Sequence, residues 1–269
     1  MLRRLLMLFL LAVLAPAVAQ AGYIVLKTYA TSDVTKDGVV IQVATTNAGQ
    51  EKAVSLEVHV FLPWGSQSSG LQPPLEPGGT RTTAIRLARL PDRPGAYAVP
   101  VRVDFRDANG YPFSSMAHAS FVYKEGVFTD VLLSLKDASL SGTARLPIRV
   151  VNLDQKAHRV RVLLALPREL RALPREQQAS LQPGQKTPLA FRLENVYATE
   201  GSSYPILALL EYEDGGRHYG MVSEAMVTIR ALPPPFKEHR RVFIALGAAL
   251  ALVVVLLEIL LAVRARREG

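Results

Sequence analysis

The strongest constraint on the fold of this chain is an internal repeat. Short motifs of the first half recur in the same order in the second half, at offsets near 105 residues. Residues 46–50 match 151–155, 61–63 match 165–167, 75–79 match 181–185, 85–87 match 191–193, and 103–107 match 210–214. Preserved order over so long an offset predicts two tandem copies of one domain, which we place at residues 22–124 and 127–230.

Each copy shows the hydrophobic pattern of β-strands that have one buried face. Apolar residues recur at every second position, as in Tyr97, Val99, Val101, Val103 and Phe105, and again in Tyr204, Ile206, Ala208, Leu210 and Tyr212. The pairs Asn109-Gly110 and Gly215-Gly216 supply the positive φ angles of tight hairpins. Roughly seven short strands per copy predict an all-β fold of two immunoglobulin-like antiparallel sandwiches. The linker at 124–126 is short, so we expect the sandwiches to be stacked end to end.

The chain begins with the features of a secretory signal peptide. Arg3 and Arg4 precede a run of uncharged apolar residues, and small residues follow at the positions of a cleavage site. We assign residues 1–19 to the signal peptide, with cleavage after Ala19 or Ala21. An uncleaved signal anchor is the alternative. In both cases the segment that follows crosses the membrane.

A second apolar run, residues 242–263, predicts a C-terminal transmembrane helix. Its 22 residues span roughly 33 Å, enough for a hydrocarbon core about 30 Å thick. Basic residues flank the run on both sides, so the positive-inside rule does not orient it, and the signal peptide has to. We therefore expect a single-pass protein of the inner or plasma membrane. Its domains face the periplasm or the exterior, residues 231–241 form a proline-rich stalk, and residues 264–269 form a basic cytoplasmic tail.

Composition excludes several classes of function. The formal net charge is +8, but without the signal peptide and the residues from Lys237 onward it falls to about +3, which is no nucleic-acid footprint. The chain has no cysteine, which excludes disulfides, thiolate metal sites and a lipoprotein anchor. The five histidines are scattered and no pair has metal-ligand spacing. We expect neither a metal nor a cofactor.

No catalytic motif stands in a suitable setting. The chain lacks a nucleophile elbow and a phosphate-binding glycine loop. Glu211, Glu213 and Asp214 form a carboxylate cluster, but the period of two points Glu211 and Glu213 to the wet face of a strand. His59 and His218 are likewise expected to be solvated. The sequence therefore favours a protein that is not an enzyme, and an enzyme remains open only if a carboxylate cleft forms where the sandwiches meet.

The motifs of the repeat resemble a known family. The first copy carries Asn47, Gly49, Leu62, Pro63, Trp64, Leu75, Pro77, Gly78, Gly95 and Tyr97, in an order similar to the prokaryotic NEW3 and CARDB group of immunoglobulin-like domains. The second copy keeps Asn152, Leu166, Pro167, Leu181, Pro183, Gly184 and Tyr204, but it has Asp154 in place of the first glycine and lacks the tryptophan. The resemblance implies the fold and an accessory or adhesion role. The layout is also similar to that of cell-surface proteins that interact with WxL proteins.

Two segments that differ between the copies are the candidate binding sites, because loops on rigid sandwiches usually carry binding. Trp64 precedes a polar run in the first copy and would stack on a sugar or anchor a protein contact; the alternative is a lid over one end of the sandwich. The equivalent segment of the second copy, residues 168–176, is expected to form one or two helical turns. Its Arg168, Arg171 and Arg175 form a modest basic patch, a candidate for binding whose alternative is a solvated surface.

The membrane helix carries candidate contacts of its own. Gly247 and Ala251 form a small-xxx-small pair, and Glu258 either reaches the headgroups or pairs with another subunit. The expected function is that of a membrane-anchored, outward-facing binding or scaffold protein of a prokaryotic envelope. Its partners are the lipid bilayer and an envelope or membrane protein. The alternative is an adhesin that binds cell-wall or other polysaccharide.

Overall fold

The computed structural model describes residues 23–231 and Ile244. The predicted signal peptide, stalk, transmembrane helix and tail lie outside the described residues, apart from Ala231 and Ile244, and so do Gly247, Ala251 and Glu258. Within the described part, no helix has the length and apolar character that crossing a membrane requires.

Residues of the first copy fold into a sandwich of two antiparallel sheets. The outer sheet has the order β1-β2-β5, with β1 (Leu26–Thr35), β2 (Gly38–Asn47) and β5 (Thr80–Arg86). The inner sheet has the order β4-β3-β6-β7, with β4 (Gly65–Gln72), β3 (Val54–Leu62), β6 (Gly95–Arg106) and β7 (Pro112–Tyr123). The predicted core set of β6 is buried, since Tyr97, Val99, Val101, Val103 and Phe105 all lie in the hydrophobic core between these sheets.

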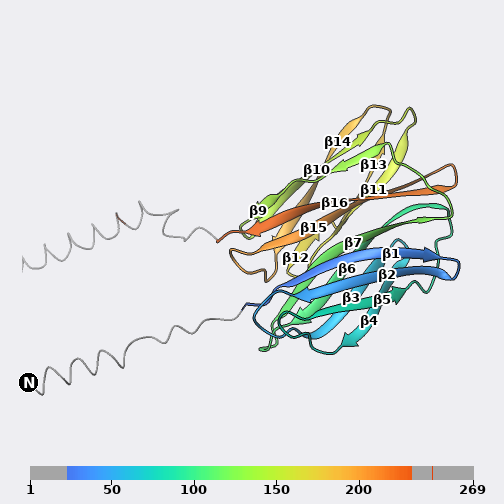
Figure 1. Cartoon of the computed structure of the whole chain (residues 1–269). Helices are drawn as coiled ribbons and strands as arrows, with labels where there is room; N and C mark the ends of the chain where they lie inside the picture. Colours follow the sequence, from blue (N-terminus) through green and yellow to red (C-terminus); the bar gives the residue numbers. More distant parts are fainter. Residues whose placement is uncertain (1–22, 232–243, 245–269) are drawn as a thin grey trace, which may run out of the picture.

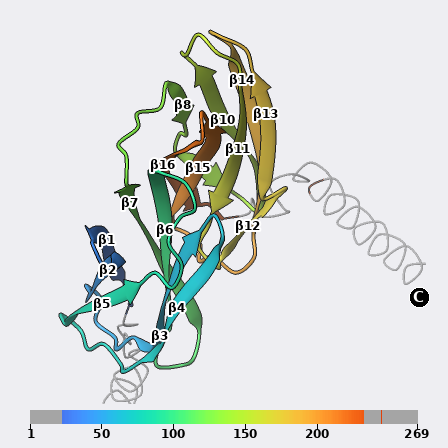
Figure 2. The same cartoon turned by 90° about the vertical axis from the view of Figure 1, so that its right-hand side faces the viewer.

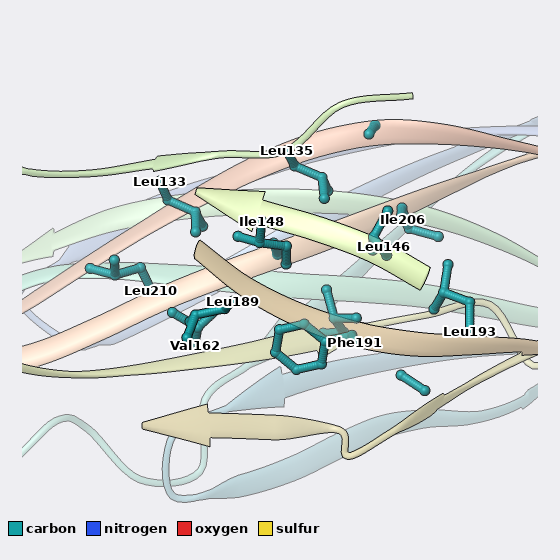
Figure 3. Packing of buried hydrophobic residues seen from close by; sticks show 14 of the residues in the cluster. Leu133, Leu135, Leu146, Ile148, Val162, Leu189, Phe191, Leu193, Ile206 and Leu210 are labelled. Carbon is teal, nitrogen blue, oxygen red and sulfur yellow. The ribbon is translucent and has the colours of Figure 1, made fainter. Parts of the chain in front are cut away.

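The second copy repeats this plan with two additional short strands. Its outer sheet has the order β12-β14-β10-β8, with β12 (Leu170–Leu173), β14 (Lys186–Asn195), β10 (Thr143–Asn152) and β8 (Val131–Ser134). Its inner sheet comprises β13 (Glu176–Leu181), β11 (His158–Ala165), β15 (Ser203–Asp214), β16 (Arg217–Ile229) and β9 (Ala138–Leu140). Phe191, Leu146, Ile148, Ile206 and Leu210 pack together in its core (Figure 3).

Both predicted hairpins are confirmed. The paired sheets of each copy confirm the predicted immunoglobulin-like sandwich. Gly110, at a φ of 85°, lies in the turn that joins β6 to β7, and Gly215 and Gly216, at 55° and 77°, join β15 to β16. The segment 168–176 was predicted to be helical, and this is wrong. Leu170 and Ala172 are buried while Arg171 and Leu173 are exposed, so the period is two, and β12 pairs with β14.

The asparagines of the repeat motif have the same role in both copies. Asn47 is fully buried; its amide donates to the carbonyls of Glu51 and Leu75, and its oxygen accepts from the Gly49 nitrogen. Asn152 makes the equivalent bonds to Lys156, Leu181 and Asp154. The motif thus satisfies buried backbone groups at the end of a strand, which is a packing function.

The two sandwiches lie side by side, which corrects the end-to-end arrangement expected from the short linker. Their inner sheets face each other and are connected at one end into a nine-stranded sheet, with one outer sheet on each sandwich (Figures 1 and 2). A separate apolar cluster fills the contact, with Ala98 and Met116 from the first sandwich and Ala165, Leu207 and Leu209 from the second. At one end the two sheets also join through a parallel pairing of β6 with β16, where His218 pairs with Gly95.

This face-to-face contact explains why residues expected on a wet face are buried. Leu207, Leu209 and Ala98 are at most 2% exposed, and Glu211 is 4% exposed, because the opposing sheet covers them. His218 is 7% exposed because it stacks on Tyr97 of the other sandwich, with ring centroids 4.2 Å apart. The expectations that Glu211 and His218 are solvated are therefore wrong.

Candidate functional site: a groove along the seam

A groove follows the line where the two inner sheets diverge. It consists of three adjoining clefts of about 270, 490 and 430 Å³. The first and second share Arg175, and the second and third share Pro63, Arg161 and Glu211. We call the three together the seam groove. It lies between the sandwiches, where the sequence left open the formation of a cleft.

The first cleft, here the arginine cleft, is lined by four guanidinium groups. Arg168, Arg171 and Arg175, the three arginines singled out from the sequence, line it together with Arg102 of the first sandwich. Arg102 donates to both oxygens of Asp104, at 2.8 and 3.1 Å, and lies over the Phe61 ring. The structure thus brings the predicted basic residues together and adds one that the sequence pattern did not indicate.

A buried carboxylate holds the arginine segment against the first sandwich. Glu169 is 1% exposed, and it accepts hydrogen bonds from the backbone nitrogen and the hydroxyl of Ser114 at 2.7 and 2.5 Å. The Ser114 hydroxyl in turn accepts a bond from the Arg168 nitrogen at 2.9 Å. Burial raises the pKa of the Glu169 carboxyl, and the bonds from Ser114 oppose part of that rise. These hydrogen bonds position Arg168, whose guanidinium lies 3.6 Å from the Asp104 carboxylate.

The middle cleft is walled by apolar side chains around one charged cluster. Arg161 contacts Glu211 at 2.5 Å and Glu176 at 3.5 Å. Burial raises the pKa of the Glu211 carboxyl, and the Arg161 guanidinium opposes part of that rise. Both carboxylates are engaged by the same guanidinium, so the charges of the cluster are paired within the protein.

The third cleft lies at the end where β15 turns into β16. It is lined by Glu213, His218, Arg159 and Arg161, among others, and Glu213 forms an ion pair with Arg93 across the seam. The His218 Nε2 atom is buried without a hydrogen-bond partner. Burial, together with the nearby Arg161 and Arg93, lowers the pKa of His218 to about 4, so the ring is neutral at physiological pH.

Trp64 does not line the arginine cleft. Its ring is half-buried, packs against the core of the first sandwich and meets the Tyr97 ring edge-on, with centroids 5.7 Å apart. Its neighbours Pro63 and Gly65 line the middle cleft. The polar run after it is strand β4.

The histidine predicted on the wet face beside Glu57, His59, is part-buried and contacts Asp104 at 3.2 Å. No group of three or more metal-ligating side chains occurs among residues 23–231.

Local sequence patterns carry no signal for several groove residues. Arg102 and Arg161 alternate with core residues in their strands, which indicates only an outward position, and the groove forms when the two outward faces meet. A partial signal exists in β15, where Leu207 and Leu209 make the strand apolar on both faces. Such a strand is expected to be covered on both sides.

Comparison with known proteins finds only remote similarity. No protein-family model matches the chain, and no curated protein matches it. Among solved structures, native alpha-2-macroglobulin of E. coli is 12% identical, with a TM-score of 0.33 over 78% of this chain. The chain spans 17% of the length of that protein.

Two smaller structures are similar over their whole length. A protein of unknown function from Porphyromonas gingivalis W83 is 16% identical, with a TM-score of 0.33, and the match covers 76% of this chain and 99% of the other. The periplasmic chaperone SfaE is 10% identical, with a TM-score of 0.32, and the match covers 77% of this chain and 100% of the other. Similarity this remote carries no argument about fold, family or activity.

Proposed function

We propose that the protein is a membrane-anchored, outward-facing binding scaffold of a prokaryotic envelope, and that the seam groove is where it holds a partner protein. The groove is the main observation behind this proposal. It combines several guanidinium groups with apolar walls, and the two sandwiches that form it are packed against each other. The signal peptide and apolar run read from the sequence support the location. We further propose that both sandwiches are of the NEW3/CARDB type, on the strength of the motif residues quoted above.

The arrangement of the described strands suits such a role. The N-terminal end of β1 and the C-terminal end of β16 lie at the same end of the molecule, whereas the turn between β15 and β16 lies at the other (Figure 1). A protein anchored beyond Ile229 would therefore present the groove along its side, with the His218 cleft farthest from the anchor. A partner that lies along the groove would be held by both sandwiches at once.

Site-specific photo-crosslinking in native membranes tests the proposal. A photoreactive amino acid replaces Ser66, which lines the middle cleft, and in a control protein it replaces Thr82, which is exposed on the outer sheet. We expect Ser66 to give a discrete crosslinked product that mass spectrometry identifies as another envelope protein, and Thr82 to give none. Absence of a product from Ser66, in protein with an unchanged melting temperature, would count against a scaffold that works through the groove.

Adhesion to a polysaccharide is the second candidate, favoured by the position of Trp64. The ring keeps part of its surface exposed, and the residues on either side of it line the groove. An aromatic face beside a groove suits a sugar ring. Retention on a glycan array that Trp64→Ala abolishes would favour adhesion. Because the ring also covers the core, the variant needs a melting curve beside the array.

A further inference from the structure

The arginine cleft holds positive charge that the protein itself does not neutralise. Arg102 and Arg168 share one carboxylate, Asp104. Arg171 and Arg175 are exposed and form no ion pair with any carboxylate among residues 23–231. A guanidinium group offers planar donors that suit carboxylates, so the cleft has the donors for an acidic side chain.

The next cleft along the groove has apolar walls around the Arg161, Glu211 and Glu176 cluster, whose charges are paired with one another. Its walls include Phe61, Pro100, Leu163 and Leu209, and Arg175 lies at the boundary between this cleft and the arginine cleft. A ligand that fills both therefore presents negative charge at one end and apolar groups beyond it. A simple anion or a uniformly charged polymer would leave the apolar walls uncovered.

Two sheet edges border the same cleft. Within the described residues, β4 pairs only with β3, and β13 pairs only with β11, so each has a free edge. Gly65 and Ser66 of β4 and Glu176 of β13 line the middle cleft. Free edges offer backbone donors and acceptors to an extended chain. This feature favours a peptide over a lipid or a sugar.

From these three features we infer that the seam groove binds an extended protein segment in which acidic residues are followed by apolar ones. The carboxylates pair with Arg171 and Arg175, and the apolar residues cover Phe61 and Leu209 in the middle cleft. This inference rests on the proposed scaffold function and specifies the chemistry of its partner.

Fluorescence anisotropy with the full-length protein in detergent tests the inference. The probe is a labelled peptide of four glutamates followed by six residues of leucine, valine and proline, and the comparison peptide has lysine in place of glutamate. We expect binding of the acidic peptide alone, and a loss of affinity of at least about tenfold in Arg171→Glu and in Arg175→Glu, since each replaces a charge-assisted contact by repulsion. The control Arg149→Glu alters an exposed arginine on the outer strand β10 and should bind like the wild type.

Three outcomes would overturn the inference. The first is equal binding of the acidic and lysine peptides, and the second is undiminished binding by both arginine variants. The third is that polygalacturonate, inorganic polyphosphate or anionic vesicles compete as well as the peptide does, since that would indicate a site for any polyanion. Failure here is separable from failure of the scaffold function. If Ser66 crosslinks to a protein partner and no acidic peptide binds, the function stands and the ligand chemistry is wrong.

Discussion

Gly95 lies where the main chains of the two sandwiches meet, and its lack of a side chain permits the meeting. Its φ is 142°, and a Cβ atom at this position would come within 2.0 Å of the His218 carbonyl oxygen. The His218 backbone nitrogen donates to the Pro94 carbonyl at 2.9 Å. This bond holds the main chain of β16 next to Gly95. We predict that Gly95→Ala lowers the free energy of unfolding by about 3 kcal/mol or more, because main chain rather than a flexible side chain has to move.

A matched variant separates the clash from the backbone strain. Gly65 has nearly the same φ, 145°, and a Cβ there would meet no atom within 4 Å. Gly65→Ala should therefore cost only the conformational strain, about 1–2 kcal/mol. Urea denaturation of both variants gives the comparison. Equal losses in the two would show that the contact with His218 does not limit residue size at position 95.

His218 gives the fold a dependence on pH with a defined sign. The folded pKa of about 4 lies below the usual value of 6.5, so the unfolded chain takes up the proton first. The stabilisation by the neutral ring is complete above pH 6.5 and is lost as the pH falls towards 4. The charged groups beside it, Arg161 and Arg93, act in the same direction.

Replacing this ring should flatten the stability profile. We predict that between about pH 7.5 and pH 4.5 the wild type loses about 2–3 kcal/mol more unfolding free energy than His218→Phe, which keeps the stacking on Tyr97 and cannot take up a proton. Denaturant melts at a series of pH values measure this difference. His118→Phe, which alters a partly exposed ring on β7, provides the control for the loss of a histidine. Parallel curves for wild type and His218→Phe would contradict the assignment.

At the scale of single elements, the sequence predicts what depends on local pattern. Alternation along β6 and β15 indicates their core faces, and paired turn residues indicate the two hairpins, because both signals arise within a dozen residues. The same rule applied to Leu170 and Ala172 would have found β12. The helical expectation for that segment is wrong because its burial alternates with a period of two and it pairs with β14.

Contacts between elements of different sandwiches were not predictable in the same way. Ala98, Met116 and Leu207 are buried by a sheet whose position depends on how the two domains dock. Only β15, apolar on both faces, indicated that something covers the inner sheet. For the same reason the sequence indicated three arginines of the groove but not Arg102. It named Glu211 but placed it on a wet face, whereas the opposing sandwich buries it.

At the scale of the whole molecule, the two sandwiches should behave as one unit. They share a packed apolar cluster, the β6–β16 pairing and ion pairs such as Arg168 with Asp104 at 3.6 Å. Domains joined by a linker alone would hinge, whereas a join of this kind fixes their relative position. The groove has a defined width only if this holds.

A large charged side chain placed in the contact should separate the sandwiches without unfolding either one. Ala98 is 1% exposed and faces the second sandwich, so Ala98→Glu inserts a larger, charged side chain into a closed apolar contact. Because the chain has no cysteine, Ser68→Cys and Gln178→Cys give a single pair of spin-label sites, one on each of the edge strands β4 and β13. Pulsed electron paramagnetic resonance should give a narrow distribution of distances between the two spin labels in the parent protein. With Ala98→Glu the distribution should be broader and shifted to longer distances. The same substitution on the exposed outer strand, Ala84→Glu, should leave the distribution narrow. An unchanged distribution with Ala98→Glu would mean that contacts other than this face, such as the β6–β16 pairing, hold the sandwiches together and set the width of the groove.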